Sequence, residues 1–164
     1  MVVVSDTTPI ISLMKAHRLD LLERLFGEVL VPDGVFMELT WNSAFQEEVE
    51  AIRTCPFIKR VSIPSNDALT MLRRASGLDL GESEAIYYAD THAVDLLLMD
   101  EVKGRQVAKS LGLRITGTVG MILSAYKEAF LTKEEVLRIV SVLQKSGRHI
   151  SDNLYRIILD AVEQ

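Results

Sequence analysis

A chain of 164 residues with 48% hydrophobic and 25% charged side chains has the size and composition of one globular domain. Its net charge of −5 excludes a protein that coats nucleic acid through a broad basic surface, although an enzyme could still act on nucleic acid through metal ions. A single cysteine, no signal-peptide pattern and no apolar run near the roughly 20 residues of a membrane span favour a cytoplasmic protein without membrane contact.

The first half of the chain alternates short apolar runs with helical patterns. Residues 2–4 (VVV) are typical of a buried strand, and Pro9 suits the first turn of a helix that Thr8 caps. The elements expected next are a helix over 19–26, a strand over 28–32, a helix from Asp33 to about Leu39, a polar helix over 44–54, a strand over 57–63 and a helix over 66–76.

The second half continues this alternation. Gly77 and Gly81 are expected to bracket a turn before the next helix. The elements that follow are a helix over 82–93, a strongly apolar strand over 95–100, a helix over 102–111, a strand over 113–116 and a helix from 119 to about 129. Strands that alternate with helices indicate an α/β fold with a mainly parallel sheet.

The remaining residues predict two further helices. Thr132 and Glu135 form a T-x-x-E capping box, and Ser151 caps the last helix. One stripe of that helix is expected to serve core or dimer packing: Leu154, Ile157, Ile158 and Ala161. We therefore expect a single domain over 1–164, with an α/β core over 1–130 and a C-terminal helical extension over 131–164 that packs on this core.

Two of the clearest predicted strands end in an aspartate. VVVS leads into Asp6 and LLLM leads into Asp100. Ligands of open parallel sheets bind outside the carboxyl ends of the strands, so both carboxylates would face one crevice if these strands are neighbours. Glu38, Glu82 and Glu84 lie on predicted helices between them. Taken singly, each acid has an ordinary alternative as a turn, a cap, a helix-dipole partner or a solvated side chain.

Several carboxylates in one crevice raise one another's pKa, and a divalent cation removes this conflict. Oxygen ligands suit Mg²⁺ or Mn²⁺, and a site with few protein ligands leaves room for water and phosphate. Such a site lowers the pKa of a bound water and stabilises the charge on a phosphoryl group. The acids therefore favour phosphodiester hydrolysis by a metal-activated water.

Several blocks, in this order, resemble the PIN-domain family of metal-dependent ribonucleases: VSDTTPIISL, the helical Glu38, GESEAI, LLLMDEVKGRQVAKSLGLRITGT and SGRHISDNLY. They span essentially the whole chain and are most similar to the bacterial and archaeal toxin-like (VapC-like) branch. The resemblance implies a three-layer α/β/α fold with extra C-terminal helices. It also implies an endoribonuclease that uses Mg²⁺ or Mn²⁺, an RNA substrate, a small antitoxin as protein partner, and a homodimer.

The resemblance assigns the four acidic positions of the family and its neighbouring hydroxyl to Asp6, Glu38, Glu82, Asp100 and Thr7. These acids would either coordinate the ion directly or hydrogen-bond to the groups that coordinate it. Thr7 would hold a water or a phosphate oxygen. The third acid has a rival two residues later, because Glu84 is also available as a metal ligand and a helix cannot point both side chains the same way.

The chain departs from the family pattern after the fourth acid. Glu101 follows at once where many members place Asp or Asn a few residues on, and Lys103 and Arg105 come next. A one-metal site with basic groups that contact the RNA backbone is the simpler interpretation. Arg73 and Arg74, by contrast, are expected to be ordinary surface residues.

Three other functions are alternatives to a metal-dependent nuclease. A PIN-like module that binds RNA or protein without cutting it stays open. A response-regulator receiver fits poorly, because an adjacent acidic pair should follow the first strand, where Thr7 and Thr8 follow Asp6. A haloacid-dehalogenase-type phosphatase needs a second aspartate at position 8, which is threonine.

Overall fold

The computed structural model describes residues 1–41, 46–147 and 150–163. Five parallel strands in the described part of the chain form one sheet in the order β3-β2-β1-β4-β5. Their bounds are β1 Val3–Ser5, β2 Val29–Pro32, β3 Ile58–Val61, β4 Leu96–Leu98 and β5 Ile115–Thr116. The expected α/β fold with a parallel sheet is confirmed.

The strand order reverses between β1 and β4. After β1 the chain adds β2 and β3 on one side, and β4 and β5 then extend the sheet on the other. Ser5 pairs with Leu98, and the Asp6 amide donates to the Leu98 carbonyl at 2.9 Å. Asp6 and Asp100 therefore follow neighbouring strands at the switch point, where ligands of open α/β sheets bind.

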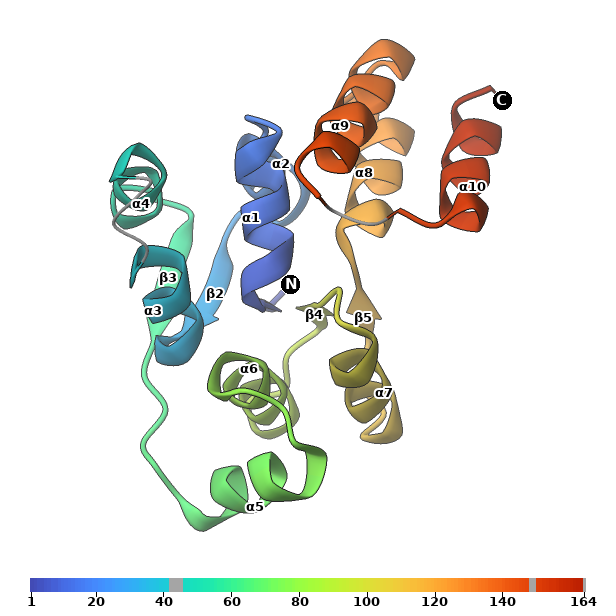
Figure 1. Cartoon of the computed structure of the whole chain (residues 1–164). Helices are drawn as coiled ribbons and strands as arrows, with labels where there is room; N and C mark the ends of the chain where they lie inside the picture. Colours follow the sequence, from blue (N-terminus) through green and yellow to red (C-terminus); the bar gives the residue numbers. More distant parts are fainter. Residues whose placement is uncertain (42–45, 148–149, 164) are drawn as a thin grey trace.

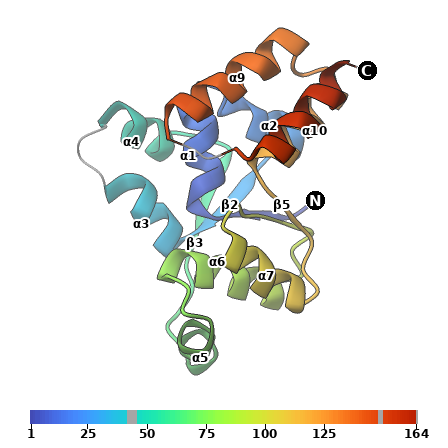
Figure 2. The ribbon, with the colours of Figure 1, turned by 45° about the vertical axis from the view of Figure 1, so that its right-hand side comes forward.

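Ten helices in the described residues cover the sheet. Those on one face are α1 Thr7–Lys15, α2 Asp20–Phe26, α8 Thr118–Lys127, α9 Lys133–Lys145 and α10 Asp152–Glu163. Those toward the other face are α5 Asp67–Ser76, α6 Leu80–Thr91 and α7 Val102–Ser110 (Figure 1). The remaining two are α3 Asp33–Trp41, which packs against β2 and β3, and α4 Gln46–Arg53, which packs against α3 (Figure 2).

Alternate strand residues supply the two cores. Val3 and Leu98 pack among α1, α2, α8, α9 and α10, whereas Val4, Leu97 and Met99 pack against α6 and α7. Successive side chains of a strand point to opposite faces, and both faces are covered at the centre of the sheet, so β2 and β4 are apolar throughout. The edge strand β3 differs, because Lys59 and Arg60 are exposed. This is the three-layer α/β/α arrangement that the resemblance implies.

Most predicted elements are present, with shifted ends. The predicted start of the polar helix at residues 44–45 lies outside the described residues. The T-x-x-E capping box is confirmed, since Thr132 accepts from the Glu135 amide and the Glu135 carboxylate accepts from the Thr132 amide. No helix in the described part of the chain has the length and apolar character needed to cross a membrane.

Two predicted helix starts are wrong. Thr8 does not cap the first helix, because α1 already begins at Thr7 and Asp6 occupies the N-cap position. Gly81 does not close a turn, because α6 begins at Leu80 and Asp79 caps it. In both places an aspartate occupies the N-cap position, but only the Asp79 side chain accepts a capping hydrogen bond.

The apolar stripe predicted in the last helix is also shifted. Ile158 and Val162 are buried against α8 and α9, whereas Leu154 and Ile157 are 39% and 44% exposed. Positions i and i+4 share a helix face, so α10 docks along a narrower line than the four-residue stripe suggested.

Candidate functional site

Asp6 is a buried carboxylate at the carboxyl end of β1. Only 2% of the residue is exposed, because the strand and the start of α1 both belong to the core. Burial, together with the nearby carboxylates of Glu82, Asp79 and Glu38, raises the pKa of Asp6 to about 7, although the hydrogen bond from the Thr7 amide acts in the opposite direction. Asp6 thus stands close to three other acids that come from two helices.

Glu38 extends from α3 toward Thr7, the residue after Asp6. The Thr7 hydroxyl donates to Oε2 of Glu38 at 2.6 Å, and Gly81 lies so close that an added Cβ would stand 2.6 Å from Oε1. Partial desolvation of the carboxylate raises the pKa of Glu38, which the Thr7 hydroxyl and the Gly81 amide counteract. Glu38 is therefore held between the first turns of α1 and α6.

The first turn of α6 contributes two acids. The Asp79 carboxylate accepts from the Glu82 amide at 2.8 Å and caps the helix. Desolvation and the nearby Asp79 raise the pKa of Glu82, and Glu101 and Glu38 add to this. Asp79 was not predicted as a site residue, although the spacing Asp79-x-x-Glu82 is a recognisable helix start.

Glu84, the rival for the third acidic position, faces another direction. It is 5% exposed, and its Oε2 accepts from the Gly34 amide in the first turn of α3 at 3.0 Å. A carboxylate at a helix N-terminus satisfies an unpaired amide and interacts favourably with the helix dipole. Glu84 therefore ties α6 to α3, and Glu82 lies nearer Asp6.

Asp100 is held by the start of α8. Its Oδ1 accepts from the Thr118 amide at 2.7 Å, and its Oδ2 accepts from the Thr118 hydroxyl at 2.6 Å. A Cβ on Gly117 would stand 2.6 Å from Oδ1, so this glycine leaves the space that the carboxylate occupies. Thr118 was not predicted, because nothing in TGT shows which strand end it will meet.

The two predicted basic residues of α7 point to different places. Arg105 donates to the Met99 carbonyl at 2.9 Å, next to Asp100. The Lys103 ammonium instead lies against Gly77, between α5 and α6. Residues two apart on a helix face different directions, so Lys103 and Arg105 cannot contact the same phosphate group in this arrangement.

Comparison with known families decides the classification. The family model DUF3368, described as a PIN domain, matches residues 2–164. The chain belongs to the PIN-domain family. PIN domains are typically nucleases that bind nucleic acid and generally use divalent metals. No curated protein and no solved structure matched this PIN domain.

The acids of this PIN domain suit a hard divalent cation by their chemistry. We name Asp6, Glu38, Asp79 and Glu82 the acid cluster; their carboxylates raise the pKa values of Asp6, Glu38 and Glu82. A bound cation would reverse these shifts. Within residues 1–41, 46–147 and 150–163, however, no three such side chains already lie close enough together to enclose an ion. Binding of a metal ion would therefore require these side chains to move closer to one another.

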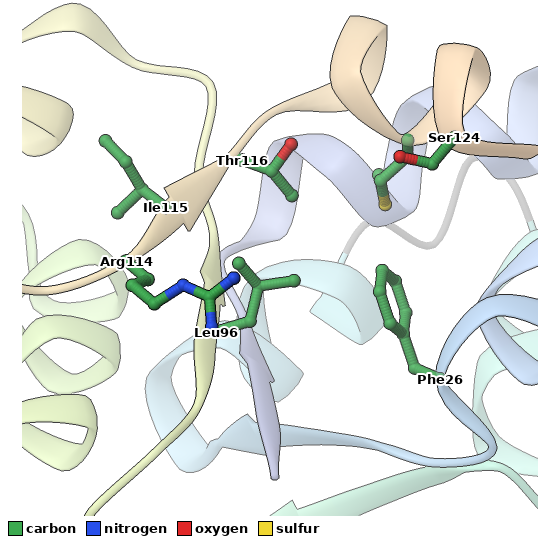
Figure 3. Close-up of a pocket in the computed structure, with 7 residues that line it drawn as sticks. Phe26, Leu96, Arg114, Ile115, Thr116 and Ser124 are labelled. Carbon is green, nitrogen blue, oxygen red and sulfur yellow. The ribbon is translucent and has the colours of Figure 1, made fainter. Parts of the chain in front are cut away.

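Two hollows of the described part of the chain differ in whether a residue of the acid cluster lines them. One of about 250 Å³ adjoins Glu38 and is otherwise lined by Gly34, Met37, Trp41 and Leu80. The other, of about 380 Å³, lies beside β5 and is lined by Phe26, Leu96, Arg114, Ile115, Thr116, Met121 and Ser124 (Figure 3). No carboxylate lines the second hollow, so its chemistry differs from that of the acid cluster.

Proposed function

We propose that this PIN domain is an endoribonuclease that hydrolyses RNA phosphodiester bonds with the help of Mg²⁺ or Mn²⁺. The observation that carries the proposal is Asp6, a carboxylate buried at the switch point of the sheet whose pKa of about 7 reflects burial and three neighbouring acids. Burial of a charge with like charges around it is costly, and a divalent cation offsets that cost.

Asp6, Glu82 and Asp100 would hold the ion in this proposal, with Glu38 positioned beside them. When bound, the ion supplies an activated water and neutralises negative charge on the phosphate. Thr7 orients Glu38 through its hydroxyl, and Thr118 fixes both oxygens of Asp100. Hydrolysis at this site would break one bond between phosphorus and a ribose oxygen. The hydroxyl of the water would end on phosphorus and its proton on the ribose oxygen, which gives a phosphomonoester and a free hydroxyl.

The third acid is assigned to Glu82. Its carboxylate interacts with Asp6, Asp79 and Glu38, whereas the Glu84 carboxylate accepts from the Gly34 amide and interacts with Glu38 but not with Asp6. Arg105 lies beside Asp100 and would contact a phosphate group of the substrate.

The finer assignments rest on the resemblance to the toxin-like branch. We propose that the protein acts in the cytoplasm as a homodimer and that a small antitoxin inhibits it by covering the acid cluster.

A cleavage assay tests the nuclease. Purified wild type should shorten labelled single-stranded RNA in Mn²⁺ at pH 8, and an Asp6→Asn/Asp100→Asn variant should lose about a hundredfold or more of the rate. Asp90→Asn/Asp160→Asn is the matched control, because both side chains are exposed on α6 and α10 and their loss should leave the rate unchanged.

Two outcomes would contradict the nuclease. If wild type and the Asp6→Asn/Asp100→Asn variant cut equally, the acids do not carry the activity. If wild type binds RNA but does not cut it in Mn²⁺ or Mg²⁺, the non-catalytic binding module becomes the better description.

A further inference from the structure

A hollow of about 300 Å³ opens where α5 meets α6. It is lined by Thr70, Arg73, Arg74, Gly77 and Leu78. Both arginines lie in the last turn of α5 and are exposed. The sequence suggested ordinary surface residues here, but the fold places the two guanidinium groups around one concave site.

A third cation reaches the same place from α7. The Lys103 Nζ lies 2.9 Å from the point where a Cβ would stand on Gly77. Gly77 has φ +70°, a conformation that favours glycine, and the missing side chain leaves the space that the ammonium occupies. Figures 1 and 2 show α5, α6 and α7 side by side at the end of the molecule opposite α9 and α10.

These three cations lack acidic partners in the described part of the chain. The ion pairs found there involve Arg18, Arg60 and Arg138, and no carboxylate lies within 4.0 Å of the charged groups of Arg73, Arg74 or Lys103. In a chain of net charge −5, two arginines that line one hollow and a lysine that lies against its Gly77, all without acidic partners, point to an anionic ligand.

The hollow adjoins the acid cluster. Gly77 comes two residues before Asp79, and two residues span at most about 7 Å. Asp79 in turn caps the helix turn that carries Glu82. An acidic site repels the phosphates of its own substrate, so a nearby group of cations would hold the strand while the cluster acts on it.

We propose that Arg73, Arg74 and Lys103 form a phosphate-binding subsite for the backbone of single-stranded RNA, next to the acid cluster. The proposal rests on the nuclease function proposed above. A guanidinium group can donate two parallel hydrogen bonds to the oxygens of one phosphate, and the Lys103 ammonium adds a further positive charge. Backbone phosphates are the expected ligand because charged side chains, and no aromatic ring, line this hollow.

The test is the salt dependence of RNA binding by the full chain. Binding of a fluorescent single-stranded RNA is measured in EDTA over a series of salt concentrations, so that cleavage plays no part. For Arg73→Gln/Arg74→Gln/Lys103→Gln the slope of log K against log salt should shrink by about 2, since each phosphate contact on a single strand contributes about 0.7. The dissociation constant at the lowest salt should rise at least tenfold.

The matched control removes three exposed lysines from the other end of the molecule, as Lys127→Gln/Lys133→Gln/Lys145→Gln. This variant should keep the wild-type slope, and Arg73→Lys/Arg74→Lys should nearly keep it because the charges remain. An unchanged slope in the Arg73, Arg74 and Lys103 variant, an equal loss in the control, or no measurable binding by wild type would each overturn the subsite.

This experiment fails separately from the nuclease. A protein that binds RNA through these cations but never cuts it would contradict the nuclease and keep the subsite. A protein that cuts RNA, but whose RNA binding has a salt slope independent of Arg73, Arg74 and Lys103, would contradict the subsite and keep the nuclease.

Discussion

Asp6 illustrates at the scale of a single residue how the fold prepares a carboxylate for a cation. The strand before it and the helix after it must both be buried, so the side chain between them is desolvated. Glu38, Asp79 and Glu82 then add negative charge around it. Burial of the Asp6 carboxylate among these acids lowers the stability of the fold, and a bound cation would restore it.

The raised pKa of Asp6 predicts how stability depends on pH without metal. Below pH 3.8 the side chain is protonated in both the folded and the unfolded chain, and its burial costs least there. As pH rises from 3.8 to about 7, only the unfolded chain loses the proton, so the free energy of unfolding should fall, by up to roughly 4 kcal/mol. Urea unfolding in EDTA at several pH values measures this.

Asp6→Asn is the control for this measurement, because the amide does not titrate. Its free energy of unfolding should fall less steeply over the same pH window, and it should exceed that of wild type at pH 8. Parallel curves for the two proteins would show that Asp6 does not titrate as described.

At the scale of elements, the close approach of α3 and α6 builds the acid cluster. Gly81 lies in the first turn of α6, where its missing Cβ leaves room for Glu38, and Glu84 one turn on binds the start of α3. α3 and α6 therefore approach closely at Gly81, next to the acid cluster. The hydrogen bond between Glu84 and the Gly34 amide joins the same two helices one turn further along α6.

Gly81→Ala tests this contact. Alanine favours a helix over glycine by about 1 kcal/mol, so the melting temperature should stay the same or rise. The new Cβ would stand 2.6 Å from Oε1 of Glu38, and that carboxylate must move. RNA cleavage in Mn²⁺ should therefore fall about tenfold or more while the fold is kept.

A double-mutant cycle with Glu38→Gln provides the control. If Gly81→Ala acts by displacing Glu38, the two substitutions should not add. Full additivity, or a large loss of thermal stability, would mean that Gly81 acts elsewhere.

At the scale of the whole molecule, the sequence predicted what local patterns determine. Two short apolar strands that each end in aspartate predicted a shared edge for Asp6 and Asp100 if the strands are neighbours, and β1 does pair with β4. The choice between Glu82 and Glu84 stayed open in the sequence, because it depends on which side of α6 meets α3. The contacts of Thr118 with Asp100 and of Lys103 with Gly77 could not be predicted either, since each joins segments that are distant in the sequence.

Anomalous diffraction from crystals soaked in Mn²⁺ at pH 8 tests whether Asp6 binds a divalent cation. A peak is expected within about 2.5 Å of a carboxylate oxygen of Asp6, with further oxygens from Glu82 or Asp100 rather than Glu84. The peak should vanish in Asp6→Asn crystals. An ordered Mn²⁺ peak elsewhere with none at Asp6, or one that survives in Asp6→Asn, would contradict it.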